Sequence, residues 1–268
     1  MWPDHRLLDL FGIEHPIVQA PMAIASDVAL AVAVAEAGGL GSLPAGAINA
    51  ETLRVHVAAF RERAPGKPVN ANFFTHRPPT PNNAREAAWR EALKPYYVEY
   101  GIDPSAPVAS ANRAPFNAAQ CEVVEALNPE VVSFHYGLPA ADLLARVKAA
   151  GCKVICSATT VTEARHLAER GCDAIIAQGN EAGGHRGMFM TDDLAAQQGS
   201  FALVPQVADA VGVPVIAAGG VGDARGIVAA LVLGAAGVQL GTAYLHCPEA
   251  KISSFIPSPI TPRAPHTR

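Results

Sequence analysis

Residues 178–187, Gln-Gly-Asn-Glu-Ala-Gly-Gly-His-Arg-Gly, combine four glycines with the ionisable side chains Glu181, His185 and Arg186. They follow the apolar run 174–177, which predicts a buried strand. Glycine permits tight turns and close approach of a ligand to the backbone, and loops after parallel strands commonly carry function. We therefore predict an active-site loop centred on His185. A solvated loop with an incidental histidine is the alternative, and the Gly-Gly-His-Arg-Gly core argues against it.

Two more glycine turns follow in the next two strand–helix units. Residues 217–223, Ala-Ala-Gly-Gly-Val-Gly-Asp, leave a strand and open a helix, and residues 239–242, Gln-Leu-Gly-Thr, end the next strand. Bare backbone N–H groups and a helix N-terminus attract anions, and the loops after the last two strands of a barrel often form a phosphate cradle. The pair predicts a phosphate site, and ordinary turn glycines are the weaker alternative.

Three further strand ends suit a ligand. Residues 19–23, Gln-Ala-Pro-Met-Ala, would let a flat ring lie against the backbone, although a plain strand-to-helix turn explains them equally well when they are taken alone. Asn72 and Gln178 are placed to hydrogen-bond a ligand where their strands end. Asn70 has the same side-chain parity as Asn72 but lies deeper, so a structural role is expected.

The elements that must position these residues alternate regularly. Strand-length apolar runs alternate with Ala-rich helical stretches in about eight units, which implies parallel strands and favours a closed barrel over an open sheet. A length of 268 residues suits one such domain. We predict an α/β fold, a (β/α)8 TIM barrel. The expected strands are 16–20, 40–43, 68–73, 131–134, 153–156, 173–177, 213–218 and 237–240.

Two segments interrupt the alternation of strands and helices. Residues 76–115, after the third strand, hold many prolines and an amphipathic piece at 84–100; so long a connection is expected to be an insertion that acts as a lid, with a solvated insertion as an equal alternative. Residues 253–268 are Pro-rich and cannot form the last outer helix. We therefore expect a truncated or aberrant C-terminus that lacks this helix.

Composition disfavours several classes of protein and of binding partner. A net charge of −4 and a pI near 6.1 disfavour nucleic acid as a partner. Apolar runs stay well short of the roughly 18 residues of a membrane span, and no signal core follows the N-terminus. Five cysteines without a Cys-x-x-Cys pair predict reduced thiols in a cytoplasmic protein and no metal site. A homo-oligomer is left open.

At this point the motifs carry a resemblance. The chain resembles the nitronate monooxygenase family, formerly 2-nitropropane dioxygenases, which are FMN-dependent TIM barrels. The resemblance runs from about residue 8 to residue 252, and the motifs occur in family order. They are Gln-Ala-Pro-Met at 19–22, Asn72-Phe73, Val-Ser-Phe-His-Tyr-Gly at 132–137, the loop 178–187, Ala-Gly-Gly-Val at 218–221 and Gln-Leu-Gly-Thr at 239–242.

The resemblance implies a role for each matched residue. His185 would be catalytic, taking a proton from a nitroalkane or orienting a bound nitronate, and His135 and Arg186 would belong to the substrate pocket. For His135, a histidine satisfied by nearby backbone is an equal alternative, and for Arg186 a structural salt bridge is preferred. The FMN phosphate and ribityl chain would be held by Gly219, Gly220, Gln239, Gly241 and Thr242. The flavin would be lined by Pro21, Met22, Asn72, Gln178 and Gly183.

The implied reaction is oxidation of an alkyl nitronate, typically propionate 3-nitronate, with O₂. A carbonyl compound and nitrite or related nitrogen oxides would form without NAD(P)H. Residues 1–252 would be the FMN-binding barrel and residues 253–268 an irregular tail. Family members continue after this point with helices that cover the barrel, and here the sequence after Ile252 does not match them.

Three rivals stay open. A flavin-dependent enoyl-acyl carrier protein reductase shares the barrel and the Gly-Gly-His loop, and NADH consumption with an enoyl thioester would identify it. A barrel that binds FMN but is inactive through loss of its C-terminal segment is the second. A phosphosugar isomerase is the third, disfavoured because no paired acid and base lie at opposed strand ends.

Overall fold

Short runs of three to six residues form the strands of one closed sheet. The computed structural model describes residues 2–106 and 114–251. All strand pairs are parallel, in the order β1-β8-β7-β6-β5-β4-β3-β2. A bridge between Val18 and Leu40 joins β1 to β2 and completes the circle, which confirms the predicted (β/α)8 TIM barrel. The strands are β1 Ile17–Gln19, β2 Gly41–Leu43, β3 Val69–Phe74, β4 Val131–His135, β5 Lys153–Ala158, β6 Ala174–Gln178, β7 Val215–Ala218 and β8 Gly237–Leu240.

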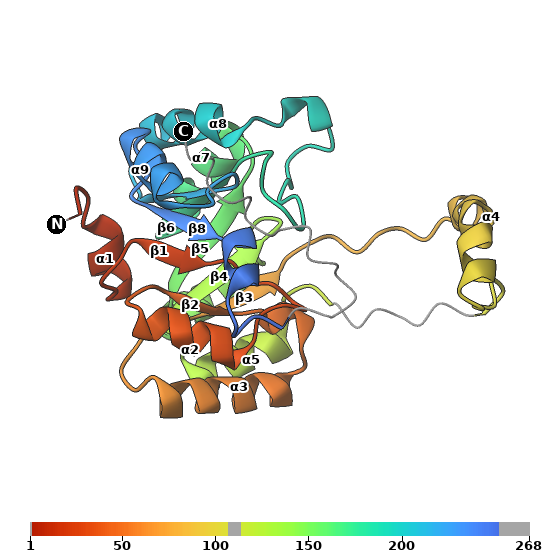
Figure 1. The fold of residues 1–268 in the computed structure, drawn as a ribbon, viewed down its shortest axis with the longest axis horizontal. Coiled ribbons are helices and arrows are strands. Elements are labelled where there is room, and N and C mark those ends of the chain that lie inside the picture. Colours follow the sequence, from red (N-terminus) through yellow and green to blue (C-terminus); the bar gives the residue numbers. More distant parts are fainter. Residues whose placement is uncertain (1, 107–113, 252–268) are drawn as a thin grey trace, which may run out of the picture.

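Helices connect these strands around the outside of the barrel (Figure 1). Several begin where a side chain caps the first turn: Asn49 accepts from the Thr52 amide, and Asn117 and Gln120 form a reciprocal capping box. The α-helices are α1 Arg6–Phe11, α2 Val28–Glu36, α3 Ala50–Arg63, α4 Asn83–Glu99, α5 Ala118–Leu127, α6 Ala141–Ala149, α7 Val161–Glu169, α8 Ser200–Ala210 and α9 Ala224–Val232. Short 3₁₀ turns are η1 Ala45–Ala47, η2 Leu194–Ala196 and η3 Thr242–His246.

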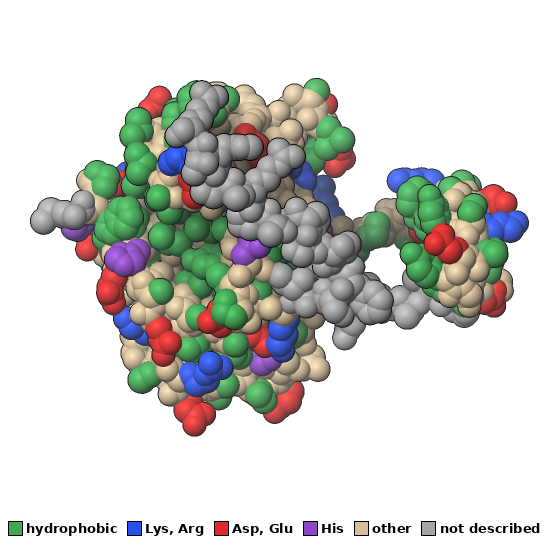
Figure 2. Space-filling view, in the orientation of Figure 1, with side chains coloured by type: hydrophobic (Ala, Val, Ile, Leu, Met, Phe, Trp, Pro, Cys, Tyr) green, Lys and Arg blue, Asp and Glu red, His purple; other side chains and the backbone are tan. Residues whose placement is uncertain are grey.

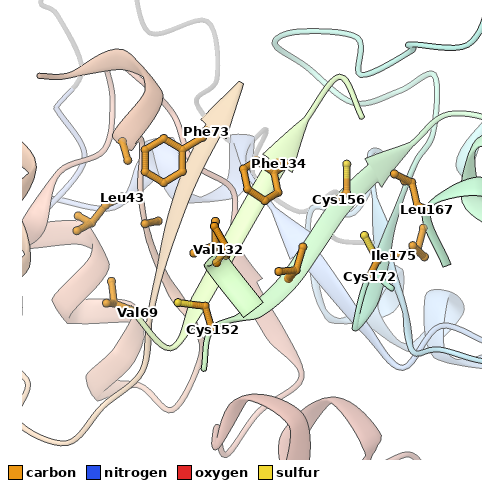
Figure 3. Packing of buried hydrophobic residues seen from close by; sticks show 14 of the residues in the cluster. Leu43, Val69, Phe73, Val132, Phe134, Cys152, Cys156, Leu167, Cys172 and Ile175 are labelled. Atoms are coloured by element: carbon orange, nitrogen blue, oxygen red, sulfur yellow. The ribbon is translucent and has the colours of Figure 1, made fainter. Parts of the chain in front are cut away.

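Two apolar layers stabilise the barrel. Outward-facing strand residues pack against the helices, and Figure 3 shows this layer around Phe73, Phe134 and Ile175. Inward-facing residues form a second cluster with α1 at the amino end of the strands; it contains Leu7, Phe11, Val18, Leu40, Val131, Ile155, Ile176 and Ile216. The sequence analysis did not predict α1, because a six-residue helix carries too little periodicity to be recognised.

The barrel interior becomes polar toward the carboxyl ends of the strands. Ser42, Asn70, Asn72, Ser133 and Gln178 are all buried there. The Nδ2 atom of Asn70 donates to Ser42 Oγ at 3.0 Å, and Nδ2 of Asn72 donates to Ser133 Oγ at 3.0 Å. Buried polar groups need such partners, so the interior side chains form a polar floor beneath the barrel mouth.

The insertion after β3 carries α4, which stands apart from the barrel in Figure 1. None of its residues is buried, and Trp89, Tyr96 and Val98 are 65%, 58% and 72% exposed. Figure 2 shows apolar and charged side chains intermixed on this helix. The predicted lid role therefore stays a prediction, and the predicted lack of a last outer helix concerns residues outside the described part of the chain. Within residues 2–106 and 114–251, no helix has the length and hydropathy that a membrane crossing requires.

Candidate active site

The loop between β6 and α8 is held at its base by the last residue of β6. The Gln178 side chain is buried; its Nε2 donates to the His185 carbonyl at 2.9 Å, and its Oε1 accepts from the Gly187 amide at 2.7 Å. A Cβ atom on Gly187 would lie 2.8 Å from His135 Cε1 and 3.1 Å from Gln178 Oε1. The loop backbone on both sides of Arg186 is thus fixed, and only glycine fits at position 187.

His185 presents its ring at the barrel mouth. The residue is exposed, and neither ring nitrogen has a hydrogen-bond partner among the described residues. Its ring centroid lies 5.4 Å from that of Phe74, 6.2 Å from that of Tyr136 and 6.5 Å from that of His135. The backbone of His185 is held while its nitrogens stay unpaired within the described part of the chain, so the imidazole suits contact with a ligand.

His135 supports the loop from β4. Its Nε2 lies 3.1 Å from the His185 carbonyl and its Nδ1 lies 3.0 Å from Ser157 Oγ. A carbonyl only accepts, so Nε2 carries the proton and Nδ1 accepts from the serine hydroxyl. Burial lowers the pKa of His135 to about 4, because the charged form loses solvation. His135 is therefore neutral, and both of its nitrogens are engaged, as in the alternative of a satisfied histidine.

Arg186 closes the loop on itself. Its Nη1 donates to the carbonyls of Gly179 at 2.7 Å and Gln178 at 3.3 Å, and its Nη2 donates to Asn180 Oδ1 at 3.2 Å. Partial burial lowers the pKa of Arg186 below its usual value. The expected structural salt bridge is replaced by bonds to neutral acceptors, so the guanidinium organises the loop base.

Glu181 ties the same loop to the next helix. Its Oε2 accepts from the Ser200 amide at 2.8 Å and from Ser200 Oγ at 2.9 Å, at the first residue of α8. A carboxylate is favourable at a helix N-terminus, where amide donors are otherwise unsatisfied. Ser200 Oγ also lies 2.8 Å from the Gly219 carbonyl, so the loops after β6 and β7 are joined.

Glu163 is a functional support that the sequence analysis missed. It is fully buried in α7, and its Oε1 accepts from the amides of Phe189 at 2.7 Å and Met190 at 3.0 Å. Its Oε2 accepts from the Thr159 amide at 2.7 Å and from Thr159 Oγ1 at 2.8 Å. The only sequence signal is Thr160 followed three residues later by glutamate, which looks like an ordinary helix capping box. The long-range contact to the His185 loop is visible only in the fold.

The glycine turns after β7 and β8 meet the loops after β1 and β6. A Cβ atom on Gly220 would lie 3.5 Å from Glu181 Cβ, one on Gly183 would lie 4.0 Å from Thr242 Oγ1, and one on Gly241 would lie 3.9 Å from Met22 Sδ. Sequence segments far apart in the chain therefore meet here, and Cβ atoms at these glycines would make ordinary van der Waals contacts with their neighbours.

The turn after β7 has the backbone of an anion site. Gly219 and Gly220 have φ of 108° and 73° in succession, and consecutive N–H groups in such turns form a concave nest for anions. Asp223 caps α9 itself by accepting from the Arg225 amide at 2.9 Å. The glycine turn, rather than the capped helix end, therefore has the backbone that suits a phosphate.

The remaining predicted cofactor residues lie at the same carboxyl end. The turn of Pro21 and Met22 is closed by Ser26, whose Oγ lies 3.0 Å from the Met22 amide. Gln239 lies in register with Val18 of β1 and Ala218 of β7. Within the described chain, the side chains of Gln239 and Thr242 make no hydrogen bond to protein.

The residues present fit FMN. The nest at Gly219 and Gly220 suits a phosphate, and turns without side chains leave the backbone open to a flat ring. Asn70 Oδ1 also lacks a hydrogen-bond partner in the described structure, but its side chain is fully buried beneath the site.

The fold and this site define a class: a (β/α)8-barrel enzyme with a histidine loop beside glycine turns at the barrel mouth. The model of the nitronate monooxygenase family matches residues 4–262. The chain belongs to this flavin-dependent family and is an oxidoreductase.

Individual relatives are also similar to this chain over most of its length. A nitronate monooxygenase of Paraburkholderia phytofirmans is 46% identical over 247 residues, which cover 92% of this chain and 67% of the relative. The solved structure of a nitroalkane oxidase from Streptomyces ansochromogenes superposes with a TM-score of 0.82 at 38% identity, covering 93% of this chain and 70% of that one. FabK from Thermotoga maritima superposes less closely, with a TM-score of 0.70 at 33% identity over 92% of this chain and 64% of that one.

Proposed function

We propose that this protein uses FMN to oxidise alkyl nitronates of the propionate 3-nitronate type with O₂, giving a carbonyl compound and nitrite or related nitrogen oxides. No NAD(P)H is consumed. The observation that carries the proposal is the exposed imidazole of His185, unpaired among the residues that the structure describes, on a loop whose backbone is fixed near the glycine turns. The family and the nitroalkane oxidase structure support it.

In this proposal residues 1–252 are the FMN-binding unit, with 76–115 as a lid. Backbone N–H groups of the two glycine turns, with Thr242 and Gln239, hold the phosphate and ribityl chain. The ring lies among the strand-end residues Pro21, Met22, Asn72, Gln178 and Gly183. When bound, FMN supplies the electron transfer between nitronate and O₂ that protein side chains cannot perform.

His185 performs the proton chemistry in the proposal. A neutral imidazole accepts a proton from the carbon next to a nitro group, or donates a hydrogen bond to a nitronate oxygen. The bonds from Gln178 and His135 to the His185 carbonyl fix the residue from below. Phe74 and Tyr136 flank the ring and limit its rotation, which favours one approach of the substrate.

The test compares two substrates in the His185→Asn variant. Activity on a neutral nitroalkane should fall at least about a hundredfold, since general-base catalysis contributes roughly 10²–10⁴, while FMN content stays normal. A preformed nitronate needs no deprotonation and should lose less. His15→Asn, an exposed histidine at the amino end of the barrel, is the matched control. Unchanged rates on the nitroalkane would remove His185 from the mechanism.

An absorbance experiment decides between this function and its rivals. The flavin bands of the purified protein should change on anaerobic addition of propionate 3-nitronate without NADH. Bands that respond to NADH and an enoyl thioester instead would indicate a reductase. Bands that respond to neither would indicate a barrel that binds FMN without turnover, and failure to bind FMN would overturn the cofactor assignment.

A further inference from the structure

Tyr136 adopts a backbone conformation that its side chain disfavours. Its φ is 74°, in the left-handed region, and Asn128 is the other non-glycine residue of the described chain with positive φ. Asn128 ends α5, where asparagine is common in this conformation. Tyrosine has no such tolerance, because its Cβ approaches the following carbonyl. Strain of this kind persists only where the surroundings impose it, and it is concentrated at functional sites.

Thr75 imposes the turn from the end of β3. Its amide donates to the His135 carbonyl at 2.9 Å, and its Oγ1 lies 2.9 Å from the His135 carbonyl and 2.7 Å from the Gly137 carbonyl. These carbonyls stand on either side of Tyr136. A Cβ atom on Gly137 would lie 2.9 Å from the ring of Phe189, so the far side of the turn is closed as well. Contacts on both sides therefore hold Tyr136 in its strained conformation.

The turn places the Tyr136 ring among the rings at the barrel mouth. Its centroid lies 4.7 Å from His135, 6.0 Å from Phe74, 6.1 Å from His76 and 6.2 Å from His185. With a negative φ the chain would leave β4 in another direction and the ring would leave this cluster. The strained backbone of Tyr136 thus places its phenol ring beside the imidazole of His185.

The phenol hydroxyl has no hydrogen-bond partner among residues 2–106 and 114–251, although a partly buried tyrosine hydroxyl usually finds a partner. Burial raises the pKa of Tyr136 above its usual value, so the hydroxyl keeps its proton at any physiological pH. A protonated phenol donates well to an anionic oxygen.

We infer that Tyr136 is a substrate-binding residue of the His185 site, that its hydroxyl donates to an oxygen of a small planar anion such as a nitronate, and that Thr75 is the positioning residue that holds it there. The inference rests on the proposed function for the identity of the anion. The phenol acts on substrate affinity.

The test separates affinity from turnover. Tyr136→Phe should raise KM for propionate 3-nitronate about tenfold or more, the fold-change typical of losing a hydrogen bond to a charged group, with kcat within about twofold and FMN content unchanged. Val55→Thr, which changes one exposed side chain on the outer helix α3, is the control and should match wild type. An unchanged KM in Tyr136→Phe would overturn the inference.

Variants of Thr75 test whether its hydroxyl holds Tyr136 in position. Thr75→Val keeps the shape but loses the hydroxyl and should raise KM as Tyr136→Phe does, whereas Thr75→Ser restores the hydroxyl and should return KM to the wild-type value. Equal KM values in the two variants would refute the positioning role, and thermal unfolding of both identifies a variant that simply fails to fold.

Wild-type behaviour separates this inference from the proposed function. If wild type does not oxidise the nitronate, the proposed function fails, and anaerobic titration with propionate 3-nitronate still compares wild type with Tyr136→Phe. A weaker dissociation constant in the variant would support the anion contact. Equal constants, or no binding to wild type, would overturn it.

Discussion

Replacing the buried carboxylate of Glu163 with an amide should loosen the loop that carries His185. The carboxylate accepts four hydrogen bonds, two from the loop at Phe189 and Met190 and two from Thr159. The three amides among these partners can only donate, whereas the Thr159 hydroxyl can also accept. In Glu163→Gln, the orientation of lower cost directs the amide oxygen at the loop and the NH₂ group at Thr159, whose hydroxyl can turn to accept but whose amide loses its acceptor.

The magnitude follows from the one amide left unsatisfied and from the weaker, neutral acceptor offered to the loop. A buried donor without a partner costs about 1–3 kcal/mol, and hydrogen bonds to a neutral acceptor are weaker than those to a carboxylate. Removing a buried charge recovers part of its desolvation cost, which places the expected loss at about 2 kcal/mol. A domain of this size loses roughly 2–4 °C of melting temperature per kcal/mol, so the variant should unfold on the order of 4–8 °C lower.

The assay combines thermal unfolding with limited proteolysis of the loop. Glu169→Gln is the matched control, because Glu169 lies on the same helix with an exposed side chain. Glu163→Gln should melt lower than this control and become more readily cleaved between residues 188 and 198. Activity on a neutral nitroalkane should fall with it, because His185 depends on the same loop.

The refuting result is specific. If Glu163→Gln melts within about 1 °C of Glu169→Gln and resists the protease equally, the four hydrogen bonds do not hold the loop. The two amides at Phe189 and Met190 would then need another acceptor, and the buried carboxylate would have only a local role at the start of α7.

The other predictions concern the loop, the pH response and the cofactor. Gly187→Ala should cost about 1–3 kcal/mol, because its Cβ would lie 2.8 Å from His135 Cε1, whereas a Cβ on Gly212 meets nothing within 4 Å, so Gly212→Ala is the control in thermal unfolding; equal melting would contradict the packing. The pKa of His135 is lowered from 6.5 to about 4, so the unfolded chain binds more protons between these values; up to about 3 kcal/mol of stability is present above pH 6.5 and is lost as the pH falls toward 4. His135→Asn should flatten this dependence, and parallel curves for wild type and variant would disprove the assignment. Thr242→Val should weaken FMN binding about tenfold, roughly the worth of one hydrogen bond, measured by fluorescence titration of the apoprotein; unchanged affinity would exclude the hydroxyl as a ligand.

The sequence predicted those parts of the protein that depend on local pattern. Strand periods, helix stops at glycine and the order of eight units are properties of neighbouring residues, and the barrel followed from them. The glycine turns at 219–220 and 241 were recognised because glycine is the residue that leaves the backbone bare. The short helix α1 was missed, since its six residues are defined by burial under the barrel rather than by their own pattern.

Residue types at the ends of strands were also sufficient to predict that His185, Gln178 and Asn72 lie near the barrel mouth. Parallel strands place their carboxyl ends at one edge, so residues distant in the chain are expected to meet there. The sequence could not assign which atoms these residues use. The Gln178 amide clamps the loop at both ends, and Asn72 donates to Ser133.

Only the tertiary structure decided the supporting contacts. Glu163 reaches the loop 26 and 27 residues further along the chain, Arg186 bonds carbonyls instead of a carboxylate, and Thr75 brackets Tyr136 across 60 and 62 residues. A sequence fixes the residue types, but whether a polar group is buried, and which partner then satisfies it, depends on the packing of distant elements. For that reason the enzyme class could be predicted from the sequence, whereas the hydrogen bonds that position His185 could not.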